Sequence, residues 1–116
     1  MLAMPRIASM SKVAPELASK APALGARIRA ARQARHLRLE DVADKAGLSR
    51  ATVEAVEKGK LSTSLGAYLA VLGCLNLADE VDLVADPGLD RQGLALQYSA
   101  KTKRVRVASA GPDNDF

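Results

Sequence analysis

Residues 39–59 constrain the fold of this 116-residue chain more than any other stretch, because they read as two short helices joined by a glycine. Apolar residues recur at helical spacing in the first segment, at Leu39, Val42, Ala43 and Ala46. Gly47 suits the left-handed end of that helix. Ser49 is a typical N-cap for the next helix, which we expect to run to Lys58 and to end at Gly59.

Helical periodicity continues on both sides of this pair. An arginine-rich helix is predicted from Ala23 onwards, with an inward stripe at Leu24, Ile28 and Ala31. A fourth helix begins near Ser62–Ser64 and ends near Asn76, which tolerates a left-handed turn. The stretch LADEVDLVAD, residues 77–86, predicts a short fifth helix. Aromatic residues make up only 3% of the chain, so the core must be aliphatic.

Beyond Gly88 the apolar residues change to a period of two, at Leu94, Leu96 and Tyr98 and again at Val105 and Val107. This alternation predicts two short strands or one long one. A lone hairpin is marginal in water, so the strands need a partner. A second copy of the chain is the simplest partner, and a hairpin folded onto its own domain is the alternative.

These patterns divide the chain into four parts. We expect a flexible N-terminal arm over residues 1–22, in which a weak helix at 14–20 is possible, and a helical domain over residues 23–85. A β-strand dimerisation segment follows over residues 86–109, and a flexible tail over residues 110–116 ends in Phe116, the only phenylalanine.

The charge is uneven along the chain. Residues 1–60 hold twelve Lys and Arg against six Asp and Glu, a net of +6, whereas residues 61–116 hold five against seven, a net of −2. A basic front half suits a phosphate backbone, although a solvated charged face fits the charge equally well.

Several classes of protein are not expected. Cys74 and His36 are each the only residue of their kind, so we expect no internal disulfide, no metal and no cofactor. No apolar run approaches the roughly 18 residues of a membrane span, and the N-terminus does not read as a signal peptide, so we expect a cytoplasmic protein. No nucleophile–base pair or phosphate loop is legible, which argues against an enzyme.

Two helices flanking KAGLS have the spacing of a helix-turn-helix, whose second helix presents its N-terminal side chains to DNA bases. The stretch LGARIRAARQARHLRLEDVADKAGLSRATVEAVEKGK resembles the Xre/Cro/repressor helix-turn-helix family. The matching residues are Arg32, Leu37, Val42, Ala43, Gly47, Ser49, Val53, Glu57 and Gly59. The resemblance covers about residues 23–76 and implies a mainly α, five-helix, lambda-repressor-like domain, here followed by the short C-terminal β segment. EDVADKAGLSRATV is also similar to the LacI-type headpiece, but an arginine-rich helix before it and EKGK after it favour Xre/Cro.

The resemblance also implies the DNA-binding residues. The family positions that meet bases correspond to Arg50, Ala51, Thr52 and Ala55, and we add Ser49 at the start of the same helix. Leu39 stands where the family usually has a phosphate-gripping glutamine, so phosphate contacts are expected from Arg38, Lys45, Lys58 and Lys60. The alternative for these four is solubilising charge. Two small alanines leave few base readers, so two half-sites and DNA shape are expected to add sequence preference.

Two glutamates in the expected recognition helix need another role, because DNA is a polyanion. Glu57 matches the family position that pairs with an arginine of the first helix, here Arg32. Glu54 lies four residues from both Arg50 and Lys58, so weak surface pairs are expected there.

The layout after residue 76 and the phrase DRQGLALQ…KRVRV resemble HipB-type antitoxins. That resemblance implies a homodimer joined by strands that contain Leu94, Leu96, Val105 and Val107. It further implies repression of its own operon through a palindromic operator in double-stranded DNA, and a HipA-like kinase toxin as partner. The alternative is a stand-alone Xre-family regulator without a toxin. Phe116 is a candidate anchor on a partner protein, against the simpler possibility of a disordered end.

Overall fold

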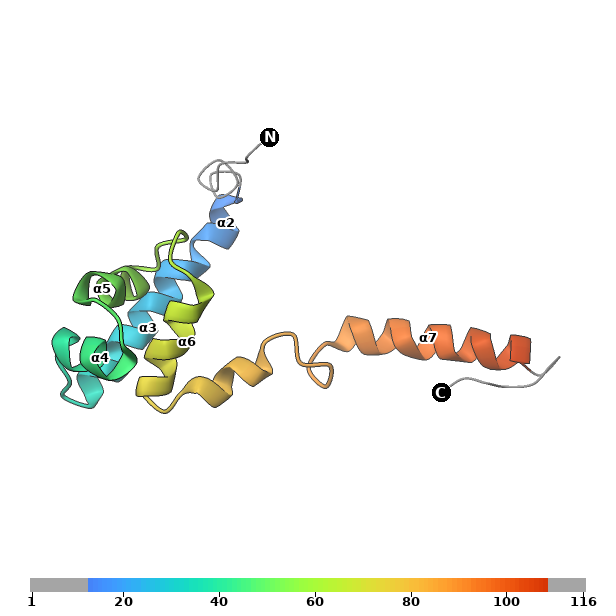
Figure 1. The fold of residues 1–116 in the computed structure, drawn as a ribbon. Helices are drawn as coiled ribbons and strands as arrows, with labels where there is room; N and C mark the ends of the chain where they lie inside the picture. The colour runs from blue at the N-terminus through green and yellow to red at the C-terminus, as the bar shows by residue number, and fades with distance from the viewer. Residues whose placement is uncertain (1–12, 109–116) are drawn as a thin grey trace, which may run out of the picture. The chain divides into compact units, whose positions relative to one another are not determined.

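The computed structural model describes residues 13–108, and the side chains of residues 13–104. Its helices are α2 (Pro15–Ala18), α3 (Lys20–Ala34), α4 (Leu39–Ala46), α5 (Arg50–Lys58), α6 (Leu65–Cys74) and α7 (Arg91–Ala108), with a 3₁₀ helix η1 (Ala78–Leu83) (Figure 1). The chain divides into two units, one ending at Ala78 and the other beginning at Asp79. Each unit is described by itself below.

The N-terminal unit packs its helices around an aliphatic core, as the composition predicts. α5 contacts α3, α4 and α6, and α4 also contacts α6 (Figure 1). The core consists of Ile28, Val42, Ala43, Val53, Val56, Ala67, Val71 and Leu75. Leu37, Leu39 and Leu48 pack against it from the segments around α4. Burial of the core side chains, which come from α3, α4, α5 and α6, is what holds these four helices at fixed angles.

The predicted helix ends are confirmed. The Ser49 hydroxyl accepts a hydrogen bond from the Thr52 backbone N–H at 3.1 Å, which caps α5. Gly47 and Gly59 have left-handed backbone conformations, with φ of 70° and 69°, and end α4 and α5. Asn76 is also left-handed, with φ of 61°. The ends of these helices are therefore determined by a local N-cap and by residues in left-handed conformations, both of which can be recognised in the sequence.

Gly25 allows α3 and α5 to approach each other closely. A Cβ atom built at this buried residue would lie 2.7 Å from the carbonyl oxygen of Val56 and still closer to that of Glu57. Real Cβ atoms essentially never come within 3.0 Å of another heavy atom, so neither backbone could keep its place. The two helices thus meet at a position where only glycine fits.

Helical structure begins before residue 23. Residues 15–18 form α2, with Pro15 at its first position, and α3 starts at Lys20. Proline is well tolerated there because the first helical N–H has no partner within the helix. The possible helix at 14–20 is therefore present, while residues 1–12 lie outside the described part of the chain.

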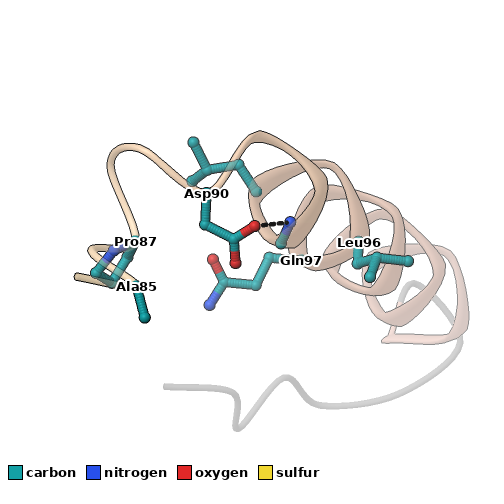
Figure 2. A pocket seen from close by; sticks show the side chains of 7 residues that line it. Ala85, Pro87, Asp90, Leu96 and Gln97 are labelled. Atoms are coloured by element: carbon teal, nitrogen blue, oxygen red, sulfur yellow. Dashed lines mark hydrogen bonds between the residues drawn. The ribbon is translucent and has the colours of Figure 1, made fainter. Parts of the chain in front are cut away.

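The predicted strands are wrong: residues 13–108 contain no strand, and residues 91–108 form α7. Leu94, Leu96, Val105 and Val107 therefore lie on a helix and cannot pair as a dimer sheet. The helix begins behind Asp90, whose carboxylate accepts the Gly93 backbone N–H at 2.9 Å (Figure 2). Ala, Leu, Gln, Lys and Arg are strong helix formers and make up most of α7. This cap and these propensities outweigh the period-two pattern.

The predicted fifth helix is shorter and tighter than expected. The structure has the 3₁₀ helix η1 over Ala78–Leu83, and the left-handed Ala85, with φ of 58°, follows it. Asp86 then turns the chain by accepting the Gly88 N–H at 2.9 Å. With no buried residue in η1, little packing is available to extend it into an α-helix.

Candidate nucleic-acid interface

The turn between α4 and α5 holds the start of α5 in a defined place. The Leu48 N–H donates to the Ala43 carbonyl at 3.0 Å, and the half-buried Leu48 side chain packs against the core. Arg50 and Ala51, at the first positions of α5, are exposed, whereas Thr52 and Ala55 are half-buried. The four predicted base-contacting residues thus lie on the same short helix, with the arginine at its accessible end.

The hydroxyls of Ser49 and Thr52 lie 2.9 Å apart and form a hydrogen bond with each other. Because Ser49 also accepts the Thr52 N–H, both side chains serve the cap of α5 as well as facing solvent. Among residues 13–104, Arg50 has no hydrogen-bond or ion-pair partner for its side chain. Arg50 is consequently the polar group at this end of α5 that has its full hydrogen-bonding capacity free for a ligand.

The predicted phosphate contacts are all exposed, but they differ in what surrounds them. The Arg38 guanidinium lies 3.3 Å from the Asp41 carboxylate, and the Arg38 N–H donates to the same carboxylate at 2.8 Å. That backbone hydrogen bond, helped by the guanidinium, lowers the pKa of Asp41. Lys45, Lys58 and Lys60 have no ion pair within residues 13–104. Arg38 therefore has a structural role at the start of α4, whereas the charges of the three lysines are unpaired within the described residues.

The predicted contact between Arg32 and Glu57 is present. Nε of Arg32 donates to one Glu57 oxygen at 2.6 Å, and Nη2 donates to the other at 3.0 Å. Nη1 donates to the Leu37 carbonyl at 2.8 Å, so the guanidinium connects α3, α5 and the loop before α4. Arg32 is only 9% exposed. The hydrogen bonds that Arg32 donates to Glu57 raise the pKa of Arg32, which keeps this buried side chain charged.

The weak surface ion pairs predicted for Glu54 are not formed. Within residues 13–104 no ion pair joins it to Arg50 or Lys58, although the spacing along α5 allows both. Instead, Glu54 lies at a hollow of about 230 Å³ in the N-terminal unit. The hollow is lined by Arg29 and Arg32 of α3, Leu39 of α4, and Glu54, Glu57 and Lys58 of α5.

Arg29 is the residue that sequence reasoning missed in this hollow. It is exposed, and it lies three residues before Arg32 on α3, a spacing that places both on neighbouring positions of one helix face. This three-residue spacing is the sequence feature from which a position of Arg29 beside Arg32 could have been predicted. Leu39, which stands at the start of α4, is half-buried against the core and lines the same hollow.

Within residues 79–104 of the C-terminal unit, the hollow is of a different kind. A hollow of about 500 Å³ at the start of α7 is lined by Ala85, Pro87, Asp90, Gly93, Leu94, Leu96 and Gln97 (Figure 2). Its one ionisable lining residue, Asp90, already caps the helix. Leu94 and Leu96 are exposed on α7, the side chains of Val105 and Val107 are beyond those described, and Phe116 lies outside the described residues.

A model of the helix-turn-helix domain family matches residues 23–84, which is more than half of the chain and includes α3 to α6 almost entirely. The chain therefore belongs to the helix-turn-helix domain family, within its Xre/Cro-type group, and the domain is of a DNA-binding type. A comparison with curated proteins gave no match. Across residues 13–108, no helix is both long enough and apolar enough to span a membrane.

Proposed function

We propose that this protein is a sequence-specific DNA-binding transcriptional repressor whose α5 enters the major groove. The observation that carries the proposal is the exposed, unpartnered Arg50 at the capped start of α5, within a domain of a DNA-binding family. In this docking mode α4 crosses the sugar–phosphate backbone while the first residues of α5 reach base edges. The proposed action is binding, and no side chain is assigned to catalysis.

Few side chains of α5 can contact bases, and this favours recognition by two copies of the chain. Arg50 suits a bidentate contact to guanine, Thr52 can reach a base or a phosphate, and Ala51 and Ala55 offer only methyl contacts. One such helix discriminates weakly. We therefore propose that the protein acts as a homodimer on a palindromic operator, so that two copies of α5 read two half-sites one helical turn apart.

A more specific candidate is a HipB-type antitoxin that binds a HipA-like kinase toxin. Its structural support was a pair of C-terminal strands, and residues 91–108 are a helix instead. What remains in its favour is the DNA-binding domain with a C-terminal extension. We accordingly put forward the stand-alone regulator first and keep the antitoxin as the second candidate, to be decided by whether a kinase-like protein copurifies from the native host.

The test begins by selecting bound sequences from a random duplex library with the full-length protein. Fluorescence anisotropy then compares wild type, Arg50→Ala and a control, Arg27→Ala on the exposed surface of α3, on the selected duplex and on a scrambled one. We expect Arg50→Ala to weaken binding to the selected duplex about 10- to 100-fold, with a small loss on the scrambled duplex.

The other results contradict specific parts of the proposal. An equal loss on both duplexes assigns Arg50 to a phosphate rather than to a base. Enrichment of no sequence at all removes sequence-specific recognition. Enrichment of a single half-site, bound by one copy of the chain, removes the proposed dimer.

A further inference from the structure

The hollow beside α5 contains more positive charge than its own contacts use. Arg32 and Glu57 neutralise each other through two hydrogen bonds, and both side chains are nearly buried, at 10% and 6% exposure. The other charged lining residues are Arg29, Lys58 and Glu54. Within residues 13–104 none of these three has an ion-pair partner. Two cations therefore face one carboxylate, which leaves a net of one positive charge.

The hollow also has room for a ligand. Its volume of about 230 Å³ is several times the roughly 30 Å³ that one water molecule occupies in the liquid. Leu39, at the first position of α4, forms an apolar part of the wall. Leu39 thus offers no polar group to a ligand, whereas Arg29 of α3 and Lys58 of α5 line the hollow with positive charge.

We propose that Arg29 and Lys58 together bind one phosphate of the DNA backbone in this hollow, beside the start of α4. This inference rests on the proposed DNA-binding function, because in that docking mode α4 crosses the backbone and brings phosphates to this side of the motif. A guanidinium matches the oxygens of a phosphate in a two-pronged contact, and an ammonium adds a point charge. Arg29 therefore extends the phosphate-binding surface from α4 and α5 to α3.

The carboxylate of Glu54 favours a phosphate of the DNA backbone over a free phosphate ion in this hollow. Its carboxylate repels any anion there, so the net attraction for a free ion is small. A backbone phosphate is different, because the other contacts of the motif hold it in place at high effective concentration. The hollow is therefore assigned to a phosphate within duplex DNA, and inorganic phosphate at millimolar concentration is expected to leave it empty.

The experiment measures the dissociation constant of the full-length chain for the selected and the scrambled duplex at several salt concentrations. For the double variant Arg29→Ala/Lys58→Ala we expect the slope of log K against log salt to fall by about 0.9 on both duplexes, the value for one lost phosphate contact. Arg29→Ala alone is expected to lower the slope by part of that amount, because Lys58 still neutralises the phosphate. The preference for the selected duplex stays unchanged. Arg29→Lys is expected to keep the slope, and Glu54→Gln is expected to tighten binding to both duplexes.

Arg27→Ala is the matched control, because Arg27 is exposed on the same helix but does not line the hollow. An equal fall in slope for Arg27→Ala, or an unchanged slope for Arg29→Ala, overturns the inference. A second result also overturns it. In that result, inorganic phosphate raises the melting temperature of wild type but not of Arg29→Ala, while the two proteins have the same salt slope for DNA binding. Failure of wild type to bind any duplex instead removes the proposed function itself.

Discussion

The carboxylate of Glu57 on α5 receives two hydrogen bonds from the guanidinium of Arg32 on α3, at 2.6 and 3.0 Å. The same guanidinium holds the Leu37 carbonyl at 2.8 Å, just before α4 begins. One buried arginine thus connects the supporting helix to both halves of the helix-turn-helix. The glutamate, which first looks unsuited to the proposed recognition helix, fixes the position of that helix against α3.

Removing one partner of this pair is expected to destabilise the domain strongly. Glu57→Gln leaves a charged arginine nearly buried without its counter-ion, and breaking such a pair costs about 3–5 kcal/mol. Urea denaturation followed by circular dichroism measures the change. Glu54→Gln on the same helix is the control and should stay within about 0.5 kcal/mol of wild type. A Glu57→Gln variant as stable as that control contradicts the structural role given to the pair.

Gly25→Ala is expected to lower stability, because the new methyl group meets the Val56 and Glu57 carbonyls of α5. Overpacking of this kind costs about 1–3 kcal/mol. Gly73→Ala is the matched control, since a Cβ at that helical position has nothing within 4 Å. There the change should stabilise the protein by about 0.5–1 kcal/mol. Thermal melts of the two variants should therefore move in opposite directions, and a shared direction refutes the close-approach argument.

The N-terminal unit was largely predictable because its signals are local. Ser49, Gly47 and Gly59 mark helix ends through cap and backbone chemistry that acts within a few residues. The Arg32–Glu57 contact spans 25 positions and was predictable only through the family resemblance. No local rule states which arginine of α3 reaches which acid of α5, because that depends on how the two helices pack.

The C-terminal part was mispredicted for a different reason. Leu94, Leu96 and Tyr98 alternate as strand residues do, but Leu94 and Tyr98 are also four apart, as on a helix face. Periodicity over so few residues cannot separate the two. The deciding signal was Asp90, an N-cap residue followed by helix formers, which the period-two pattern obscured.

The Asp41 contact makes stability depend on pH at the acidic end. Hydrogen bonds from Arg38 lower the pKa of Asp41 below its ordinary value of 3.8 in the folded state. The folded state thus binds the proton less readily than the unfolded state, and the contact stabilises fully above that ordinary value. The contribution disappears as pH falls through the lower, folded pKa. Asp41→Asn should remove this part of the acid dependence, as urea unfolding of both proteins from pH 6 to pH 2 would show.

Asp90→Ala is expected to weaken α7. Loss of an N-cap costs about 0.5–2 kcal/mol, and the described side chains of α7 are exposed or half-exposed, so little packing compensates. Amide hydrogen exchange over residues 91–104 should become faster in this variant. Asp82→Ala, outside α7, should leave these rates unchanged. Cross-strand contacts between amides in this region, detected by NMR, contradict the helix altogether.

The ion pair between Arg32 of α3 and Glu57 of α5 lies near the C-terminal end of α5, away from the proposed base-contacting residues at its start. Arg50 is seven residues from Glu57, about 10 Å along the helix axis. A tilt of α5 by roughly 10° about this ion pair would move Arg50 by about 2 Å, several times the roughly 0.5 Å that a productive contact tolerates. In the proposed docking mode the choice of base therefore also depends on Gly25 and Arg32, two residues of α3 outside the proposed base-contacting set. Altered operator preference can arise from substitutions that leave every base-contacting side chain in place.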